Sequence, residues 1–314
     1  MFIVNHKNKF FILSAAFVVF SLFSIFFWGL NPSIEFTGGA IVEIRYEGDR
    51  PPIADMYTSL NTGAFGAVLV QETKKDGFII RTKDLTSEER ASLFDALSFG
   101  NTRKVFEERY SLVGPSIGKE LRNKAWVAIA LVLFGIVFFI AFAFRNVGHG
   151  SVQSVRGGVS SWHYSTAALI ALAHDVVIPA GIFSFLGSRF IDAQIDVLFV
   201  TALLAILGYS IHDTIVVFDR VRENVRLNQE LKSKATFKET VGISLMQTMG
   251  RSINTSLTTL LALLALFFIG SEATKNFALV LSVGIIAGTY SSIFLASTLL
   301  VKMSEWRRRD ATSY

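Results

Sequence analysis

The chain has 314 residues, of which 51% are hydrophobic and 18% are charged, with a mean hydropathy of +0.48 and a formal net charge of +5. A soluble domain carries roughly 25% charged residues, so this composition excludes an ordinary soluble protein and predicts a membrane protein. The sequence contains no cysteine, which excludes disulfides, thiolate metal sites and cysteine catalysis. It has no basic run with interleaved aromatic residues, so we expect no nucleic-acid partner.

The first apolar segment predicts a transmembrane helix over residues 10–30, after Lys7 and Lys9. It is longer than the ~7–15 residues of a signal-peptide core and has no A-x-A cleavage site, so we expect it to be retained. Five later segments are also long enough to cross a ~30 Å hydrocarbon core. The six predicted spans are residues 10–30, 125–144, 164–187, 195–218, 253–270 and 276–301.

The segment between the first two spans predicts a folded α+β domain. Alternating apolar residues predict strands at 40–46, 67–72, 78–82 and 103–113, with a helix at 52–61. Thr86 and Glu89 form a capping-box pattern that begins a second helix. The order βαββαβ is typical of a ferredoxin-like sandwich, and we find no catalytic constellation within it.

The distribution of basic residues predicts that both termini are cytoplasmic. The two short segments on the opposite side hold only Arg189 and Lys275, and long loops cross a membrane largely regardless of charge. The basic residues on the predicted cytoplasmic side are Lys7, Lys9, Arg145, Arg156, Arg220, Arg222, Arg226, Lys232, Lys234, Lys238, Arg251, Lys302, Arg307, Arg308 and Arg309.

These patterns divide the chain into four parts. Residues 1–30 form a cytoplasmic N-terminus and the first span, and residues 31–124 form the extracytoplasmic domain. Residues 125–301 form a bundle of five spans, with cytoplasmic loops at 145–163 and 219–252, and residues 302–314 form a cytoplasmic tail.

Asp213 is the most informative residue of the predicted bundle, because it lies within the apolar fourth span. A carboxylate at the centre of a membrane helix costs at least ~2.5 kcal/mol and usually handles ions or protons. Arg251 opens the fifth span and is the candidate partner of Asp213. Two alternatives stay open: Asp213 as a structural hydrogen-bond acceptor, and Arg251 as an anchor that extends to the membrane surface.

Other polar residues lie within or at the ends of the predicted spans. His174 and Asp175 lie in the third span, ahead of Pro179 and Gly181, which favour a kink. The pair is either functional or a satisfied structural pair. His212 points ~100° away from Asp213 around the helix, so adjacency does not predict contact. Asp219 fits a solvated helix end, and Gly284, Gly288 and Ser292 form a small-residue packing face.

Several motifs together resemble the SecD/SecF family of bacterial protein-translocase subunits, on the SecF side of that family. The most specific is Gly208–Asn224 (GYSIHDTIVVFDRVREN), which contains Asp213. The resemblance covers essentially the whole chain. The other matching motifs are Phe36-Thr37-Gly38-Gly39, Val113–Leu121 with its Gly114-Pro115 pair, and Ala173–Val176.

The resemblance implies half of a transporter of the resistance–nodulation–division (RND) type, which works with SecD. It implies help in the late steps of protein export through SecYEG, driven by the proton-motive force, in a bacterial inner membrane. YajC and YidC are further candidate partners, and the outer domain is expected to contact the translocating polypeptide. Asp213 and Arg251 are implied in proton movement, with His174, Asp175, His212 and Asp219 as auxiliary candidates. We expect no enzymatic activity, cofactor or metal.

The chain departs from the family pattern at three places. His212 stands where asparagine is common, and Glu35 stands where aspartate is common. The segment 147–159 is longer and richer in glycine and serine than expected, which is typical of a flexible insertion.

Three other functions compete with this interpretation. The main alternative is half of a proton-driven RND-type pump for small molecules or lipids, although the single outer domain is small for that task. An intramembrane hydrolase is disfavoured because the chain lacks the Gly-x-Ser-x-Gly and His-Glu-x-x-His motifs. A structural scaffold would leave proton coupling unaffected when Asp213 or Arg251 is replaced.

Overall fold

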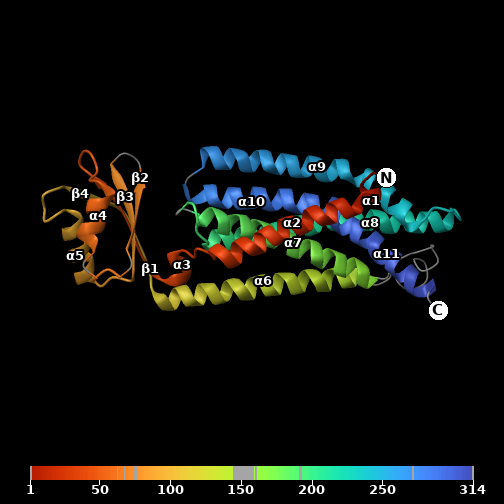
Figure 1. Cartoon of the computed structure of the whole chain (residues 1–314), viewed down its shortest axis with the longest axis horizontal. Coiled ribbons are helices and arrows are strands. Elements are labelled where there is room, and N and C mark those ends of the chain that lie inside the picture. Colours follow the sequence, from red (N-terminus) through yellow and green to blue (C-terminus); the bar gives the residue numbers. More distant parts are fainter. Residues whose placement is uncertain are drawn as a thin grey trace. The chain divides into compact units, whose positions relative to one another are not determined.

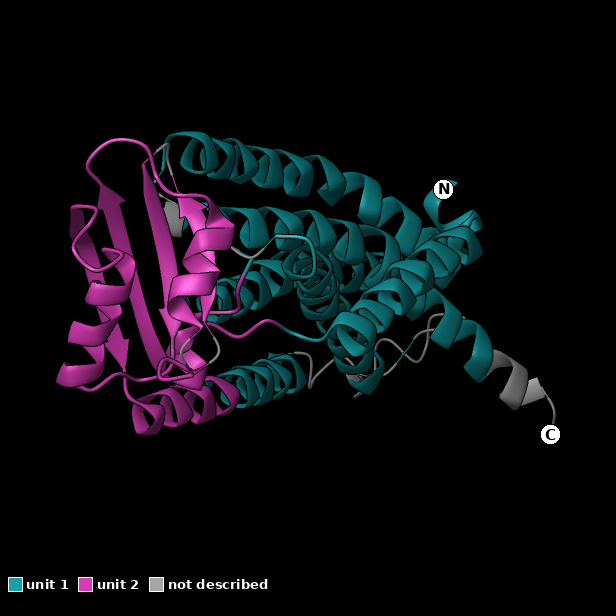
Figure 2. Ribbon diagram, turned by 60° about the vertical axis from the view of Figure 1, so that its left-hand side comes forward, with its two compact units in different colours: residues 1–30, 128–193, 198–314 teal, residues 31–127, 194–197 magenta. Residues whose placement is uncertain are grey.

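The computed structural model describes residues 2–61, 63–66, 68–73, 76–143, 159, 161–190, 193–270 and 272–312. The chain forms two compact units, coloured separately in Figure 2. Unit 1 comprises Met1–Leu30, Ala128–Ala193 and Leu198–Tyr314, and it is helical. Unit 2 comprises Asn31–Val127 and Gln194–Val197, and it contains a sheet.

Long apolar helices dominate the chain, as labelled in Figure 1. Six helical segments of the described residues are long and apolar enough to span a membrane, which confirms the six predicted spans. The helices are α1 (Phe2–Asn5), α2 (Lys7–Trp28), α6 (Pro115–Ala143), α7 (Ser161–Gly187), α8 (Val197–Glu230), α9 (Phe237–Ile269), α10 (Glu272–Tyr290), the π-helix η2 (Ser291–Ala296) and α11 (Ser297–Thr312).

The helices α8 and α9 extend beyond the apolar segments that predicted them. Only residues 231–236 separate them, so the predicted loop 219–252 is corrected to two helical ends. Val221 and Val225 on α8, and Val241 and Leu245 on α9, are buried at helical spacing, while the charged residues lie on other faces. Hydropathy alone does not detect helix ends that bury one face and carry charged residues on the others.

Two further predictions concern the connection between α6 and α7. Most of the predicted loop 145–163 and of the Gly/Ser-rich segment 147–159 lies outside the described residues. Within these segments, Val159 is described and buried, and α7 begins at Ser161. The second span begins earlier than predicted, because α6 starts at Pro115.

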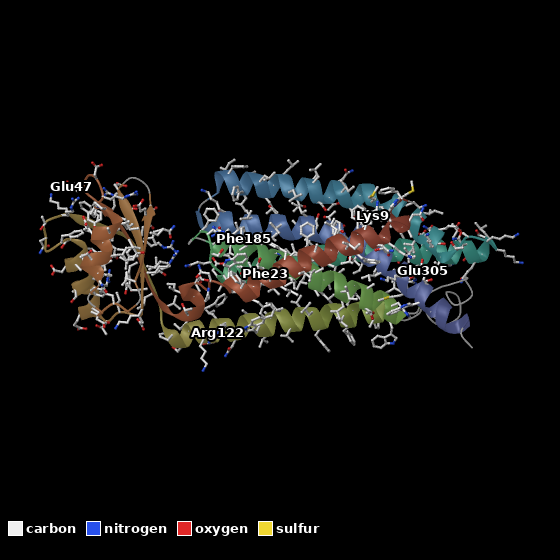
Figure 3. The ribbon with its side chains drawn as sticks, viewed as in Figure 1. Lys9, Phe23, Glu47, Arg122, Phe185 and Glu305 are labelled. Atoms are coloured by element: carbon white, nitrogen blue, oxygen red, sulfur yellow. The ribbon has the colours of Figure 1, made fainter. Side chains whose placement is uncertain are left out.

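Helices α2 and α7 approach each other closely through small residues. A Cβ atom added at Gly181 on α7 would lie 2.3 Å from the Cα of Ser21 on α2. The Ser184 hydroxyl donates to the carbonyl of Ser24 at 2.9 Å. At one end of this contact Phe185, labelled in Figure 3, packs edge-on against Trp28 with 5.2 Å between ring centroids. Helix α7 stays helical through Pro179, so Gly181 serves close packing.

The small-residue face predicted in the sixth span packs closely in the structure, and the helix it contacts is α8. A Cβ atom at Gly284 would lie 2.1 Å from the Ile206 side chain, and one at Gly288 would lie 3.0 Å from the Cβ of Ser210. The span is interrupted by η2, a π-helical segment between α10 and α11. Such segments are rare and are often found at functional sites.

Unit 2 contains a four-stranded antiparallel sheet in the order β2-β3-β1-β4. This order confirms the predicted ferredoxin-like topology. Val42, Ile44 and Tyr46 of β1 are fully buried in its core. The elements are α3 (Ile34–Thr37), β1 (Gly39–Tyr46), α4 (Ile53–Leu60), β2 (Leu69–Thr73), β3 (Gly77–Thr82), α5 (Ser87–Leu97) and β4 (Val105–Val113).

Candidate functional site

The carboxyl group of Asp213 is buried inside unit 1, with only 4% of the residue exposed. Its Oδ2 atom has no hydrogen-bond partner among the described residues, and the same holds for the buried hydroxyl of Ser252 on α9. Ser252 and Arg251 on α9, and His212 on α8, lie near this carboxyl. A buried carboxylate oxygen without a donor is uncommon and calls for a functional explanation.

Arg251 lies on α9 one residue before Ser252, and its side chain is exposed. It makes no ion pair within 4.0 Å with any residue that the structure describes. Arg251 is therefore near enough to Asp213 for a Coulombic interaction without a direct salt bridge. The pairing of the two side chains stays a prediction.

His212 and Asp219 do not join the buried carboxyl. Both residues are exposed on α8, whereas Asp213 faces the interior of the unit. The ~100° step between successive helical residues explains why His212 and Asp213 face different surroundings.

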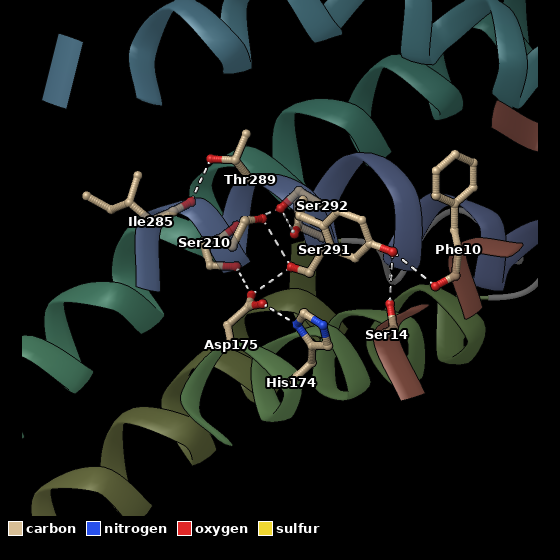
Figure 4. Close-up of polar contacts among 12 residues, drawn as sticks. Phe10, Ser14, His174, Asp175, Ser210, Ile285, Thr289, Ser291 and Ser292 are labelled. Carbon is tan, nitrogen blue, oxygen red and sulfur yellow. Dashed lines mark hydrogen bonds and ion pairs between the residues drawn. The ribbon is translucent and has the colours of Figure 1, made fainter. Parts of the chain in front are cut away.

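His174 and Asp175 form the centre of a second polar group, shown in Figure 4. Asp175 is completely buried and His174 is 4% exposed. The Nδ1 atom of His174 lies 2.9 Å from Asp175 Oδ1. The Ser291 hydroxyl donates to Asp175 Oδ2 at 2.8 Å, and the Ser210 hydroxyl donates to the same oxygen. We call His174, Asp175, Ser210, Tyr290, Ser291 and Ser292 the Asp175 cluster.

The Asp175 cluster holds α8 on both sides of Asp213. Ser210 precedes Asp213 by about one helical turn, and its carbonyl accepts a hydrogen bond from Ser292 at 3.3 Å. Thr214 directly follows Asp213, and its hydroxyl lies 2.8 Å from the Ser292 hydroxyl. This link is not predictable from the sequence, in which its only signal is the pair of adjacent serines Ser291-Ser292 in an apolar span.

The Phe36-Thr37-Gly38-Gly39 motif forms a tightly packed backbone joint in unit 2. Gly38 and Gly39 have φ angles of 77° and 137°, which other residues rarely adopt. Added Cβ atoms would lie 2.8 Å from the Cα of Pro115 and 2.6 Å from the carbonyl oxygen of Thr82, respectively.

The neighbouring residues of the motif complete this joint. Phe36 is buried, and the Thr37 hydroxyl donates to the carbonyl of Ser33 at 3.1 Å. Pro115 begins α6, whereas Gly114 before it has open space where a Cβ would be. These residues therefore fix the backbone, and their side chains form no cluster of reactive groups. No group of three or more metal-ligating side chains occurs in the described part of the chain.

Family models and individual relatives of this chain all point to the same group of protein export membrane proteins. The family model for the C-terminal region of the protein export membrane protein SecD/SecF matches residues 95–156 and 159–306. The SecD/SecF GG motif model matches residues 23–49. The protein translocase subunit SecF of Thermobaculum terrenum is 40% identical over 98% of this chain and 94% of its own length. The protein translocase subunit SecDF of Thermus thermophilus is 36% identical over 92% of this chain and 36% of its own, greater length.

A solved structure supports the same relationship. The crystal structure of SecDF, a translocon-associated membrane protein from Thermus thermophilus, matches with a TM-score of 0.77 and 33% identity. The match covers 96% of this chain and 38% of that chain. Together with the family models, these matches show that the chain belongs to the SecD/SecF family of protein export membrane proteins.

Proposed function

We propose that this chain is an accessory subunit of the Sec protein-export machinery, which forms a complex with SecD and uses the proton-motive force to promote late steps of translocation. The observation that carries the proposal is the buried Asp213, whose Oδ2 atom lacks a donor among the described residues. An ionisable group inside a membrane bundle is by default a functional group. The family of the chain supplies the process that this group would drive.

Proton binding at Asp213 would act through electrostatics. When the carboxylate takes up a proton, its attraction to Arg251 is lost and the penalty for burying its charge disappears. Helices α8 and α9 carry these two residues, so each change of protonation favours a different relative position of the two helices. A cycle of proton uptake and release would then drive repeated movement.

The proposal extends to the partners and to the topology. SecD is the expected second half, because the SecDF relative of Thermus thermophilus combines both names in one chain. SecYEG, with YajC and YidC, would be the machinery that the complex serves. Both termini are placed in the cytoplasm by the positive-inside pattern, and the domain 31–124 would contact the emerging polypeptide.

The proposal is tested by export in cells that rely on this chain. Replacing Asp213 with Asn removes the titratable group at nearly constant volume, so we expect secretory precursors to accumulate. Asp219→Asn is the matched control, because Asp219 is an exposed carboxylate on the same helix. Normal export in the Asp213→Asn strain would contradict the proposal.

The role of Arg251 is tested with the same export measurement. Arg251→Lys keeps a positive charge near Asp213, whereas Arg251→Met removes it. We expect export to survive the first change better than the second. Equal export by both variants, with the complex intact, would mean that Arg251 is only a surface anchor.

A further inference from the structure

The Asp175 cluster contains a fully buried carboxyl group, and the function proposed above does not use it. Asp175 lies near the middle of α7 and is fully buried between α8 and η2. We propose that Asp175, with His174, forms a second proton-binding site, and that Ser291 responds to its occupancy. The proposal takes its purpose from the proton-driven function proposed above, although its chemistry is independent of Asp213.

In the ionised state, every hydrogen bond of Asp175 is of the type that a carboxylate accepts. Ser210 and Ser291 donate to Oδ2, and His174 Nδ1 donates to Oδ1 at 2.9 Å when its proton is on that nitrogen. Three donors replace the water that the buried carboxylate has lost. These hydrogen bonds therefore stabilise the ionised form of Asp175.

The protonated state can be formed by rotation of a hydroxyl group. The Ser291 oxygen lies 2.8 Å from Asp175 Oδ2 and 3.1 Å from the carbonyl oxygen of Gly288, but its single proton can be donated to only one of them. When Oδ2 takes a proton from a hydronium ion, its new O–H donates to Ser291, and Ser291 turns to donate to Gly288. One O–H bond of the hydronium ion breaks and leaves a water molecule, one O–H bond forms on Oδ2, and the negative charge of the carboxylate is removed. No group of the cluster loses its partner.

The other titratable groups that face Asp175 are few. On α7 there is His174, and on α10 there is Tyr290, whose ring lies over the His174 ring at 6.0 Å. The Tyr290 hydroxyl donates to the carbonyl of Phe10 on α2 at 3.0 Å. From α8 and η2 only the serine hydroxyls reach the carboxyl, and no lysine or arginine pairs with it in the described part of the chain.

The second nitrogen of His174 provides an independent observation. Its Nε2 atom is buried and has no hydrogen-bond partner among the described residues. With the Nδ1 proton directed at Asp175, Nε2 carries a lone pair. It is the only ring atom still able to accept a proton, so the pair contains an open acceptor beside a carboxylate.

The π-helix η2 connects this site to Asp213. Ser291 binds Asp175, while the next residue, Ser292, binds Thr214 and the Ser210 carbonyl on α8. A change in the bonding of Ser291 is therefore transmitted by one peptide unit to the residues that flank Asp213. This arrangement would allow the two proton sites to influence each other.

The test is infrared spectroscopy of the complex of this chain with SecD in lipid vesicles, titrated over pH. A protonated buried carboxyl gives a C=O stretching band that disappears on deprotonation. We expect this band to remain in Asp213→Asn and to be lost in Asp175→Asn, which preserves the side-chain volume. Identical titrations of the wild-type and Asp175→Asn complexes would overturn the proposal.

Two serine variants test the site without changing its carboxyl group. Ser291→Ala removes a donor to the ionised form, so we expect the band to titrate about one pH unit higher, a tenfold change in proton affinity. Ser282→Ala is the matched control, because the Ser282 hydroxyl on α10 donates to the carbonyl of Ala278 and lies outside the Asp175 cluster, and we expect no shift. An unshifted Ser291→Ala titration would contradict the proposed role of Ser291.

The infrared result is separable from the export result. If Asp213→Asn exports normally while the Asp175 band titrates, the proposed function fails and the second proton site stands. If Asp213→Asn blocks export while no Asp175 band is found, the proposed function stands and the second site fails.

Discussion

At the scale of single residues, two aspartates of the same bundle have opposite surroundings. Asp213 has an oxygen without a partner, whereas Asp175 accepts from three neighbours. The sequence predicts both candidates, because a carboxylate in an apolar segment is costly. It does not reveal the serines, because a hydroxyl in a helix can bond to the carbonyl four residues before it, as Ser256 does with Ser252. Hydropathy therefore does not show whether a serine in an apolar helix bonds to its own backbone or to another side chain.

Tyr46 offers a test of the domain core at the residue scale. Its hydroxyl is buried and donates to the carbonyl of Leu97 at 2.8 Å, and burial raises the pKa of Tyr46 to about 12. Because the folded-state pKa lies above the unfolded value of ~10, the stabilisation is complete below pH 10 and is lost as the pH rises towards 12.

We expect a loss of about 2–3 kcal/mol of stability across that interval. Thermal unfolding of the purified chain as a function of pH measures it. Tyr46→Phe should lower stability at neutral pH and reduce this alkaline dependence, whereas Tyr57→Phe, on the exposed side of α4, should retain it. An unchanged alkaline profile in Tyr46→Phe would show that another group is responsible.

At the scale of elements, apolar length predicts which segments span the membrane, but it does not predict where the helices end or which of them touch. Helices α8 and α9 continue past their apolar runs, because their charged ends still bury one face. The contact between α2 and α7 depends on the small residues Gly181, Ser21 and Ser24. In the sequence, such residues do not indicate which helix they will contact. The π-helix is not predictable either, since Ser291–Ala296 continue the apolar pattern of the span without a break.

The packing of α2 on α7 predicts opposite effects for two glycine substitutions. Gly→Ala in a helix is normally favourable by up to about 1 kcal/mol, and Gly135 on α6 has nothing within 4 Å of an added Cβ. Gly181→Ala should instead destabilise, typically by ~1–3 kcal/mol for overpacking, because the new methyl group meets the Ser21 backbone. Thermal unfolding of the two detergent-solubilised variants compares them. Equal stability would contradict the close contact.

At the scale of the whole molecule, one face of α8 indicates where a partner lies. Thr201, Ala205, Gly208 and His212 are exposed at spacings of four, three and four residues, and thus share one side of the helix. Small and polar residues in a membrane helix favour contact with another helix over contact with lipid. Hydropathy gives no hint of this face, because exposure is known only once the other helices are placed.

This face predicts an effect on assembly that is separate from folding. Gly208 has open space around its Cβ position within this chain, so Gly208→Leu should fold normally and weaken the complex with SecD. Co-purification from membranes measures assembly, and the yield of the chain controls for folding. Gly135→Leu on α6 is the matched substitution. Full recovery of SecD with Gly208→Leu would place the partner elsewhere.

The central claim is that Asp213 couples proton flow to export. The most direct measurement is export of a secretory protein into inverted membrane vesicles that contain SecD, SecYEG and either this chain or its Asp213→Asn form, with and without a proton gradient. We predict that the gradient stimulates export with the original chain and the Asp219→Asn control, and gives no stimulation with Asp213→Asn, while all complexes assemble. Equal stimulation of the original and Asp213→Asn vesicles would contradict the account and make Asp213 a structural residue.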